Sequence, residues 1–324
     1  MKDKSKAHKP LIKAIVPIGI GLIYALITRL LFNLEPLSAH LAIVSWSFIV
    51  VMPFAFGGIT TLIGIRLCGR SHFWIYTAPI VSILLGFAVS FILNLEALLC
   101  IIVAAPIMMV SAMLGGMTCN ALLIKFDSKL QLNLLVLLPF ASSQLERVWE
   151  QPHELVTIND SIVIESDAHT IWEQIASVPA IGEDELPFQF IYLLDFPKPI
   201  SAVIDYKGVG GERKAIFERN VTFYEKVTEW EEDKTLSFTI HADPEFIPRS
   251  AFDQHIIVGG RFYDVLNGTY RIESHETHCV LHLSSTHRIS SPFNAYAGFW
   301  SEWVMNQIQG SILVVIKARC EKEA

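Results

Sequence analysis

The sequence predicts a chain in two parts of different fold class. Residues 1–145 are expected to form four or five transmembrane α-helices. Residues 146–324 are expected to form an α+β domain in which a curved antiparallel sheet wraps a long C-terminal helix.

Only 18% of the 324 residues are charged, whereas soluble proteins are usually about 25% charged. The first part holds 10 basic and 4 acidic residues, and the second holds 15 and 28. Long apolar runs fill the first part, and strand-like alternation fills most of the second.

Four segments of the first part are long and apolar enough to cross a bilayer. Crossing the hydrocarbon core takes roughly 20 helical residues, and the segments span 14–34, 41–65, 73–93 and 97–124. A fifth apolar stretch over 130–138 is shorter and is followed by Pro139. It is predicted either as a last span broken at Pro139 or as an interfacial segment.

Basic residues predict the orientation, because cytoplasmic loops are enriched in lysine and arginine. Lysines crowd the N-terminus, the loops after the second and fourth spans carry basic residues, and the loops after the first and third carry none. The pattern predicts a multi-pass protein of the bacterial inner (plasma) membrane with a cytoplasmic N-terminus. If the fifth stretch crosses, as we expect, residues 146–324 are periplasmic or otherwise extracytoplasmic. If it does not cross, they are cytoplasmic.

The spans hold few groups suited to transport chemistry. Arg29 lies near the outer end of the first span and is expected to extend toward the lipid headgroups. The pairs Gly57-Gly58 and Gly115-Gly116 are interpreted as helix-packing contacts. We therefore predict a membrane anchor rather than a transporter.

The second part begins with a predicted strand over 156–165, and Asp167 is the expected N-cap of a helix over 169–178. Strand-like runs separated by turn residues follow at 201–207, 211–219, 222–231, 236–241, 254–262, 268–274 and 279–288. A helix with one apolar stripe ends the chain over 293–319. Because the links between strands are hairpin-length, the sheet must be antiparallel. The last helix is the only element able to cover it, and a curved sheet on such a helix leaves a cavity.

Several of these segments carry a resemblance to a known superfamily. They are residues 161–178, the G-x-G-x-x-R turn over 208–213, the E-x-V-T-E-W strand within 223–230, residues 260–271 and the helix over 300–317. They resemble the START-like, Bet v 1-like (SRPBCC) superfamily, which has the helix-grip fold and includes polyketide cyclase/dehydrase and lipid-transport proteins. The resemblance covers residues 156–320 and implies an internal pocket for a hydrophobic or amphipathic molecule. The membrane part resembles no transporter family that we can name.

Seven residues are predicted to line that pocket: Arg213, Phe217, Glu229, Tyr263, His287, Trp300 and Trp303. Arg213 and Phe217 share one strand face by alternation. Arg213 either meets an anionic ligand head group or Glu229, or it forms a structural ion pair at the strand edge. The ion pair is favoured, because buried arginines are usually paired within the protein. Glu225 and Glu229 are expected on one face of their strand, and His287 at the cavity mouth.

The predicted function is binding of a lipid-like small molecule by a membrane-anchored helix-grip domain. The expected partners are the lipid bilayer and that molecule, and the sequence specifies no protein partner. No cofactor or metal is predicted, because the histidines near residues 275–287 lack a completing carboxylate or thiolate. Nucleic acid is not expected, since the basic residues form no patch. The alternatives are a cyclase/dehydrase-type enzyme acting on a hydrophobic substrate, with Arg213, Glu229 or His287 in the pocket, and a non-catalytic interaction module.

Overall fold

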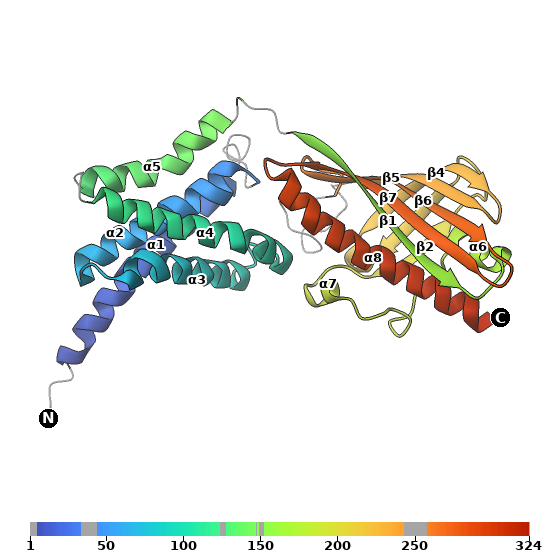
Figure 1. Cartoon of the computed structure of the whole chain (residues 1–324), viewed down its shortest axis with the longest axis horizontal. Helices are drawn as coiled ribbons and strands as arrows, with labels where there is room; N and C mark the ends of the chain where they lie inside the picture. The colour runs from blue at the N-terminus through green and yellow to red at the C-terminus, as the bar shows by residue number, and fades with distance from the viewer. Residues whose placement is uncertain are drawn as a thin grey trace. The chain divides into compact units, whose positions relative to one another are not determined.

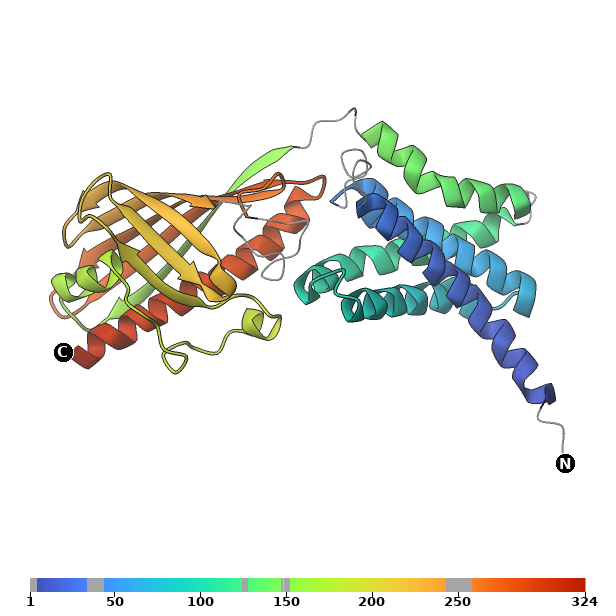
Figure 2. The ribbon, with the colours of Figure 1, turned by 180° about the vertical axis from the view of Figure 1, so that it is seen from behind.

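The computed structural model describes residues 5–33, 44–123, 128–146, 148, 152–242 and 258–323. Contacts divide the chain into two compact units, Met1–Glu150 and Gln151–Ala324, which Figures 1 and 2 show from opposite sides. The predictions for the loop over 35–40, for Lys125 and for residues 254–257 fall outside the described residues.

All regular secondary structure in the described residues of the first unit is helical, with short turns between the helices. Its helices are α1 (Ser5–Asn33), α2 (Met52–Cys68), α3 (Ala78–Ile92), α4 (Leu98–Leu122) and α5 (Ser128–Glu146), with π-helical turns η2 (Ser47–Val51) and η3 (Phe73–Thr77) leading into α2 and α3. Four stretches are long and apolar enough to cross a membrane: Ile15–Phe32, Ser47–Cys68, Phe73–Ile92 and Leu98–Leu122. These stretches correspond to the four predicted spans.

Helices α2 and α4 pack with their backbones in direct contact. A Cβ atom added at Gly57 would lie 1.9 Å from the backbone oxygen of Ala112. One added at Gly115 would lie 1.9 Å from the backbone oxygen of Phe54. Only glycine allows this approach, so the packing role predicted for Gly57 and Gly115 is confirmed.

Arg29 does not extend toward headgroups, and that prediction is wrong. Its Nε donates to Glu96 Oε1 at 2.5 Å, and its Nη2 donates to the carbonyl of Leu95 at 2.9 Å. Both acceptors lie in the connection between α3 and α4, which folds over the end of α1. A carboxylate within the bundle therefore replaces the headgroup as the partner of the guanidinium.

Helix α5 runs without interruption through Pro139, so the predicted break there is wrong. Proline lacks the N–H that would bond to the carbonyl of Leu135. The hydroxyl of Tyr24 on α1 donates to that carbonyl at 3.4 Å, which compensates the missing bond. At the end of α5, Glu146 accepts from the backbone N–H groups of Trp46 and Ser47 at 2.8 and 3.1 Å.

The second unit is a seven-stranded antiparallel sheet covered by α8 (Asn294–Glu323). Its strands are β1 (His153–Ile164), β2 (Pro199–Ile204), β3 (Glu212–Phe217), β4 (Thr222–Glu231), β5 (Thr235–Ala242), β6 (Tyr263–Ser274) and β7 (Cys279–Ser290). The spatial order is β1-β7-β6-β5-β4-β3-β2. Helix α8 lies across one face of the curved sheet (Figure 1). This is the predicted helix-grip layout.

Most strand boundaries shift by up to three residues from the prediction, and the largest difference concerns β6. Strand β6 begins at Tyr263 rather than at Gly268, and residues 258–262 form no strand beyond a bridge between Val258 and Tyr263. The Asn267-Gly268 pair, which predicted a turn, lies within β6 beside a β-bulge after Val265. A Cβ added at Gly268 would lie 2.7 Å from the ring of Phe238, so this glycine serves close packing.

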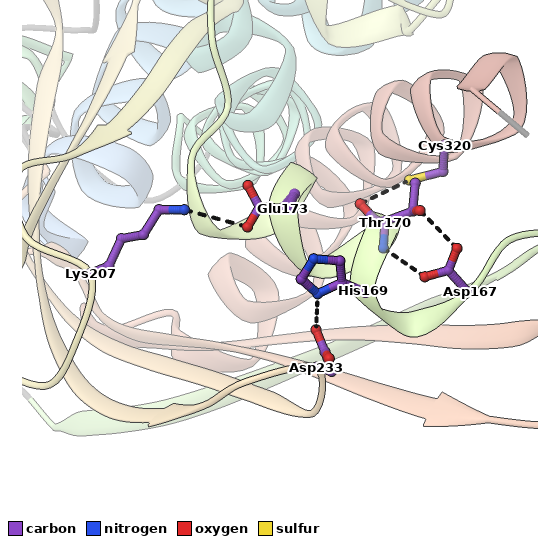
Figure 3. A network of polar contacts seen from close by, with 7 residues as sticks. All are labelled: Asp167, His169, Thr170, Glu173, Lys207, Asp233 and Cys320. Atoms are coloured by element: carbon purple, nitrogen blue, oxygen red, sulfur yellow. Dashed lines mark hydrogen bonds and ion pairs between the residues drawn. The ribbon is translucent and has the colours of Figure 1, made fainter.

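Two short helices lie between β1 and β2 in the sequence: α6 (Ala168–Ala176) and α7 (Phe190–Leu193). Asp167 caps α6 as predicted, with Oδ1 accepting from the Thr170 N–H at 3.0 Å. Figure 3 shows that α6 is also held by His169, which lies 3.0 Å from Asp233, and by a hydrogen bond from Lys207 to Glu173. The core between sheet and helices contains Trp172, Ile175, Leu236, Phe238, Leu281, Leu313 and Ile316.

Candidate functional site

A pocket opens between α8 and the β2–β3 edge of the sheet. Its volume is about 60 Å³, well below the roughly 300–1,000 Å³ of typical ligand pockets. The apolar lining consists of Val178, Ile181, Pro199, Ala202, Ala215, Phe217, Ile312, Val315 and Ile316. Ser201, Arg213, Glu225 and Tyr270 supply the polar lining.

Strand register places a charged pair in this apolar wall. Arg213 on β3 lies directly opposite Glu225 on β4. Alternate residues of a strand share a face, so Arg213 lies on the same face as Ala215 and Phe217, as predicted. Opposite charges that face each other across two strands attract.

Arg213 and Glu225 form a buried ion pair in which Nη1 of the guanidinium donates to Glu225 Oε2. The guanidinium carbon lies 5.5 Å from the ring centroid of Phe238 and 5.9 Å from that of Tyr270, within cation–π range. The Nε of Arg213 is buried and has no hydrogen-bond partner among the described residues. A buried N–H group without an acceptor lowers the stability of the folded domain. A ligand oxygen that accepts from the Nε–H of Arg213 would remove this penalty.

The environment perturbs all three titratable groups of this wall. Burial opposes the charge of Arg213, but Glu225 and Tyr270 raise the pKa of its guanidinium above the ordinary value. Burial raises the pKa of Glu225, and the adjacent guanidinium works against that rise. Burial likewise raises the pKa of Tyr270. Arginine stays protonated in proteins, and its charge favours the ionised form of Glu225.

Glu229 does not pair with Arg213 and does not line the pocket. A β-bulge between Val227 and Glu229 shifts the register of β4 against β5. The extra residue breaks the alternation, so Glu225 is buried while Glu229 is exposed and accepts a hydrogen bond from Ser237 at 2.9 Å. The expectation that Glu225 and Glu229 share a face is therefore wrong.

His287 and Tyr263 lie in a second polar cluster inside the domain. The His287 Nε2 lies 2.7 Å from the Oγ of Ser301 on α8, and its ring centroid lies 5.3 Å from that of Tyr263. Burial lowers the pKa of His287 to about 4 and raises the pKa of Tyr263 to about 12. Both side chains are therefore neutral at pH 7, and neither contributes to the pocket lining.

Trp300 and Trp303 lie outside the pocket lining, on the first turns of α8. Their ring centroids are 5.9 Å apart, and Trp303 lies 6.0 Å from Phe190 of α7. Of the predicted pocket residues, the structure thus brings Arg213 and Phe217 together in the pocket. Tyr263 and His287 lie in a second cluster, Trp300 and Trp303 lie in a third, and Glu229 belongs to none of them.

Metal binding has no evident site in the described part of the chain. Within it, no group of three or more histidine, cysteine, aspartate or glutamate side chains is arranged to hold a metal ion. The geometry instead offers an apolar surface with one charged pair, which suits binding of an amphipathic molecule.

The fold and the pocket together define a helix-grip domain with a small pocket beside α8. No protein-family model matches the chain, and no curated protein does. Solved structures of similar fold include an uncharacterized protein from Rhizobium leguminosarum, with a TM-score of 0.34, 9% identity, and coverage of 53% of this chain and 98% of the other. The Zhui aromatase/cyclase from a Streptomyces species has a TM-score of 0.34, 14% identity, and coverage of 52% and 96%.

A truncated norcoclaurine synthase from Thalictrum flavum has a TM-score of 0.32 and 14% identity, and the match covers 51% of this chain and 92% of that one. Scores and identities of this size transfer no activity to the present chain.

Proposed function

We propose that this chain is a membrane-anchored protein whose helix-grip domain binds a hydrophobic or amphipathic, lipid-like small molecule. The observation that carries the proposal is the pocket between α8 and the β2–β3 edge, with its apolar wall and the buried Arg213–Glu225 pair. Burying apolar ligand surface there contributes roughly 25 cal/mol per Å². An oxygen of the ligand accepts from the unpartnered Nε of Arg213.

The size of the pocket limits the ligand. With a volume of about 60 Å³, the pocket accommodates only the end of an acyl chain unless α8 or the β2–β3 edge moves, so we expect a single-chain amphiphile such as a fatty acid or lysolipid rather than a two-chain phospholipid. The membrane anchor keeps the pocket near such molecules and raises their effective concentration.

The contacts within the first unit support an extracytoplasmic position for the binding domain. The stretch Ser47–Cys68 is the second span, so its first turn lies on the side opposite the N-terminus. Glu146 at the end of α5 is hydrogen-bonded to that first turn. The fourth span ends on the N-terminal side, and α5 therefore crosses the bundle from one side to the other. We propose an inner-membrane protein with its N-terminus in the cytoplasm and residues 146–324 outside it.

Ligand binding is tested by native mass spectrometry of the full chain after exposure to palmitate or lysophosphatidylcholine. We expect a one-to-one adduct that is lost in the double variant Arg213→Met/Glu225→Leu. The matched control is Arg29→Met/Glu96→Leu, which removes the other buried pair and leaves the pocket unchanged. Absence of an adduct, or an adduct equally retained in both double variants, would contradict the proposal.

The same measurement separates binding from catalysis. A cyclase/dehydrase-type reaction needs a titratable group at the pocket, and Glu225 and Tyr270, both with raised pKa values, lie in its wall. Dehydration would lower the mass of the recovered ligand by one water, and cyclisation without loss of water would change its fragmentation pattern. We expect the ligand to be recovered unchanged, since the carboxylate of Glu225 is committed to Arg213.

Topology is tested by C-terminal fusions to alkaline phosphatase and to a green fluorescent protein. We expect phosphatase activity without fluorescence, because alkaline phosphatase folds outside the cytoplasm. The reverse pattern would place the binding domain in the cytoplasm and contradict the crossing of α5.

A further inference from the structure

A set of aromatic and aliphatic side chains, four exposed and two half-buried, joins α7 to the first turns of α8. We call it the aromatic patch, and it consists of Phe188, Phe190, Leu193, Phe299, Trp300 and Trp303. Phe188, Phe190, Leu193 and Phe299 are 78%, 49%, 62% and 64% exposed. The ring contacts run from Phe299 to Trp300, from Trp300 to Trp303 and from Trp303 to Phe190, with centroids 5.8 to 6.0 Å apart.

The patch is a built surface rather than a group of loose side chains. The N–H of Phe190 donates to Gln307 of α8 at 3.1 Å, and the hydroxyl of Tyr192 donates to Ser311 of α8 at 2.9 Å. These bonds fix α7 against α8. Large exposed apolar surfaces on otherwise well-packed proteins mark interaction sites.

The patch begins next to the point where the domain is attached to the first unit. The side-chain amide of Asn294, the first residue of α8, donates to the carbonyl of Pro152 at 2.8 Å. Phe299 follows only five residues later. At the other end of the connection, Glu146 is bonded to the first turn of the second candidate span, and the turn that begins a span lies at the membrane surface.

The connection between these two fixed points is short. Residues 147–151 separate Glu146 from Pro152, and a chain extends by at most about 3.6 Å per residue. The start of α8 therefore stays within roughly 20 Å of the membrane surface, given the membrane anchoring of the proposed function. Tryptophan and other aromatic side chains are enriched in that interfacial layer.

We propose that the aromatic patch docks into the interfacial layer of the bilayer in which the same chain is anchored. The inference rests on the membrane anchoring within the proposed function, but not on ligand binding. Phe299, Phe188 and Leu193 insert their apolar groups among the headgroups and upper acyl chains. The start of α8 is thereby held at the surface, while the pocket-lining residues Ile312 and Ile316 lie further along the helix.

The test uses the full chain reconstituted in phosphatidylcholine nanodiscs containing a phosphatidylcholine with a photoreactive group near its glycerol. Crosslinked peptides are then mapped by mass spectrometry. We expect peptides over 188–193 and 294–303 to be labelled at least tenfold more than the peptide over 205–211. The peptide over 205–211 is a matched control for exposure, because Tyr206 and Val209 are 63% and 62% exposed. Strand register places the turn that contains them at the end of the sheet opposite Pro152.

Two variants sharpen the result. Phe299→Ser is expected to reduce labelling of the 294–303 peptide several-fold, whereas Val209→Ser leaves it unchanged. Hydrogen exchange of β7 reports whether each variant remains folded. If peptides of the candidate spans are labelled but those of the patch are not, docking is overturned while membrane anchoring stands. If the spans are not labelled either, both docking and anchoring are overturned.

Discussion

In the described residues, each unit has an arginine with a buried guanidinium that pairs with a glutamate, and the two pairs differ in their surroundings. In the helical unit, Arg29 pairs with Glu96 and also bonds to the carbonyl of Leu95, which fastens the α3–α4 connection over the end of α1. In the sheet unit, Arg213 pairs with Glu225 across two strands and lies against the rings of Phe238 and Tyr270.

The difference lies in what adjoins each pair. Arg213 and Glu225 border a pocket, whereas Arg29 and Glu96 join helix ends. A buried ion pair is by itself weak evidence of function, because its desolvation cost offsets much of its attraction. The comparison therefore predicts structural importance of similar size for the two pairs and unequal importance for ligand binding.

The largest expected effect comes from breaking the pocket pair on one side. Arg213→Met leaves the Glu225 carboxyl buried without its cation, which costs roughly 3–5 kcal/mol of unfolding free energy. Urea unfolding of the full chain, followed by circular dichroism of the sheet signal, measures this cost. Arg213→Met/Glu225→Leu should recover most of the loss while remaining unable to retain the ligand. Recovered stability together with recovered binding would show that the pair has no role in recognition.

Breaking the bundle pair is expected to have a similar but smaller effect. Arg29→Met leaves Glu96 without its guanidinium, and Glu96 retains more solvent access than Glu225 does. We expect a loss of about 2–4 kcal/mol, seen as a lower midpoint of thermal unfolding in detergent. Ligand retention per folded molecule should be unchanged. A selective loss of ligand in this variant would remove the distinction between the two pairs.

His287 extends the comparison from paired charges to a buried neutral group. Its folded pKa of about 4 lies below the unfolded value of about 6.5, so the unfolded state binds a proton first as the pH falls. The stabilisation that comes from keeping His287 neutral is fully present above about pH 6.5, and it is lost progressively as the pH falls toward 4. Between pH 7 and pH 5 we expect a loss of about 2 kcal/mol, measured by urea unfolding. His287→Gln should abolish most of this dependence, and an unchanged pH profile in that variant would contradict the assignment.

The smallest expected effect concerns a partly exposed pair at the pocket wall. Two of the guanidinium nitrogens of Arg319, Nε and Nη2, donate to the carboxylate of Glu185 at 2.7 and 2.8 Å. These hydrogen bonds lower the pKa of Glu185 to about 2. The stabilisation is present above the ordinary pKa of the carboxyl and is lost as the pH falls toward 2. Solvent screening limits it to about 1 kcal/mol.

The measurement is the urea midpoint of Glu185→Gln at pH 7. Glu173→Gln is the matched control, because its partner Lys207 is 3.4 Å away and both side chains are exposed. We expect a small shift in the first variant and none in the second. We also expect weaker ligand retention in Glu185→Gln, since the pair holds the segment that carries Ile181 of the pocket lining.

Periodicity and turn chemistry predicted most of the fold. Asp167 identified the start of α6, apolar runs identified the four candidate spans, and strand alternation gave β4 with its observed bounds. The prediction failed where a bulge interrupts alternation. The bulge in β4 separates Glu225 from Glu229, and the Asn267-Gly268 pair continues β6 instead of ending it.

The pocket was predicted less completely, because its wall depends on contacts between distant residues. Arg213 and Phe217 follow from alternation along one strand. Glu225 becomes a candidate only once the register of the β3–β4 hairpin is known, since it lies opposite Arg213. Tyr270 and Ile316 come from other elements, and no local pattern brings them to β3. The same limit applies to Arg29, whose partner Glu96 is 67 positions away.

Helix α8 runs unbroken from Asn294 to Glu323, a length of roughly 45 Å at 1.5 Å per residue. It bears the aromatic patch at its first turns, Ile312, Val315 and Ile316 in the pocket wall, and Arg319 near its far end. Because one continuous helix carries all three features, any change in the tilt of α8 at the pocket wall would also displace the aromatic patch.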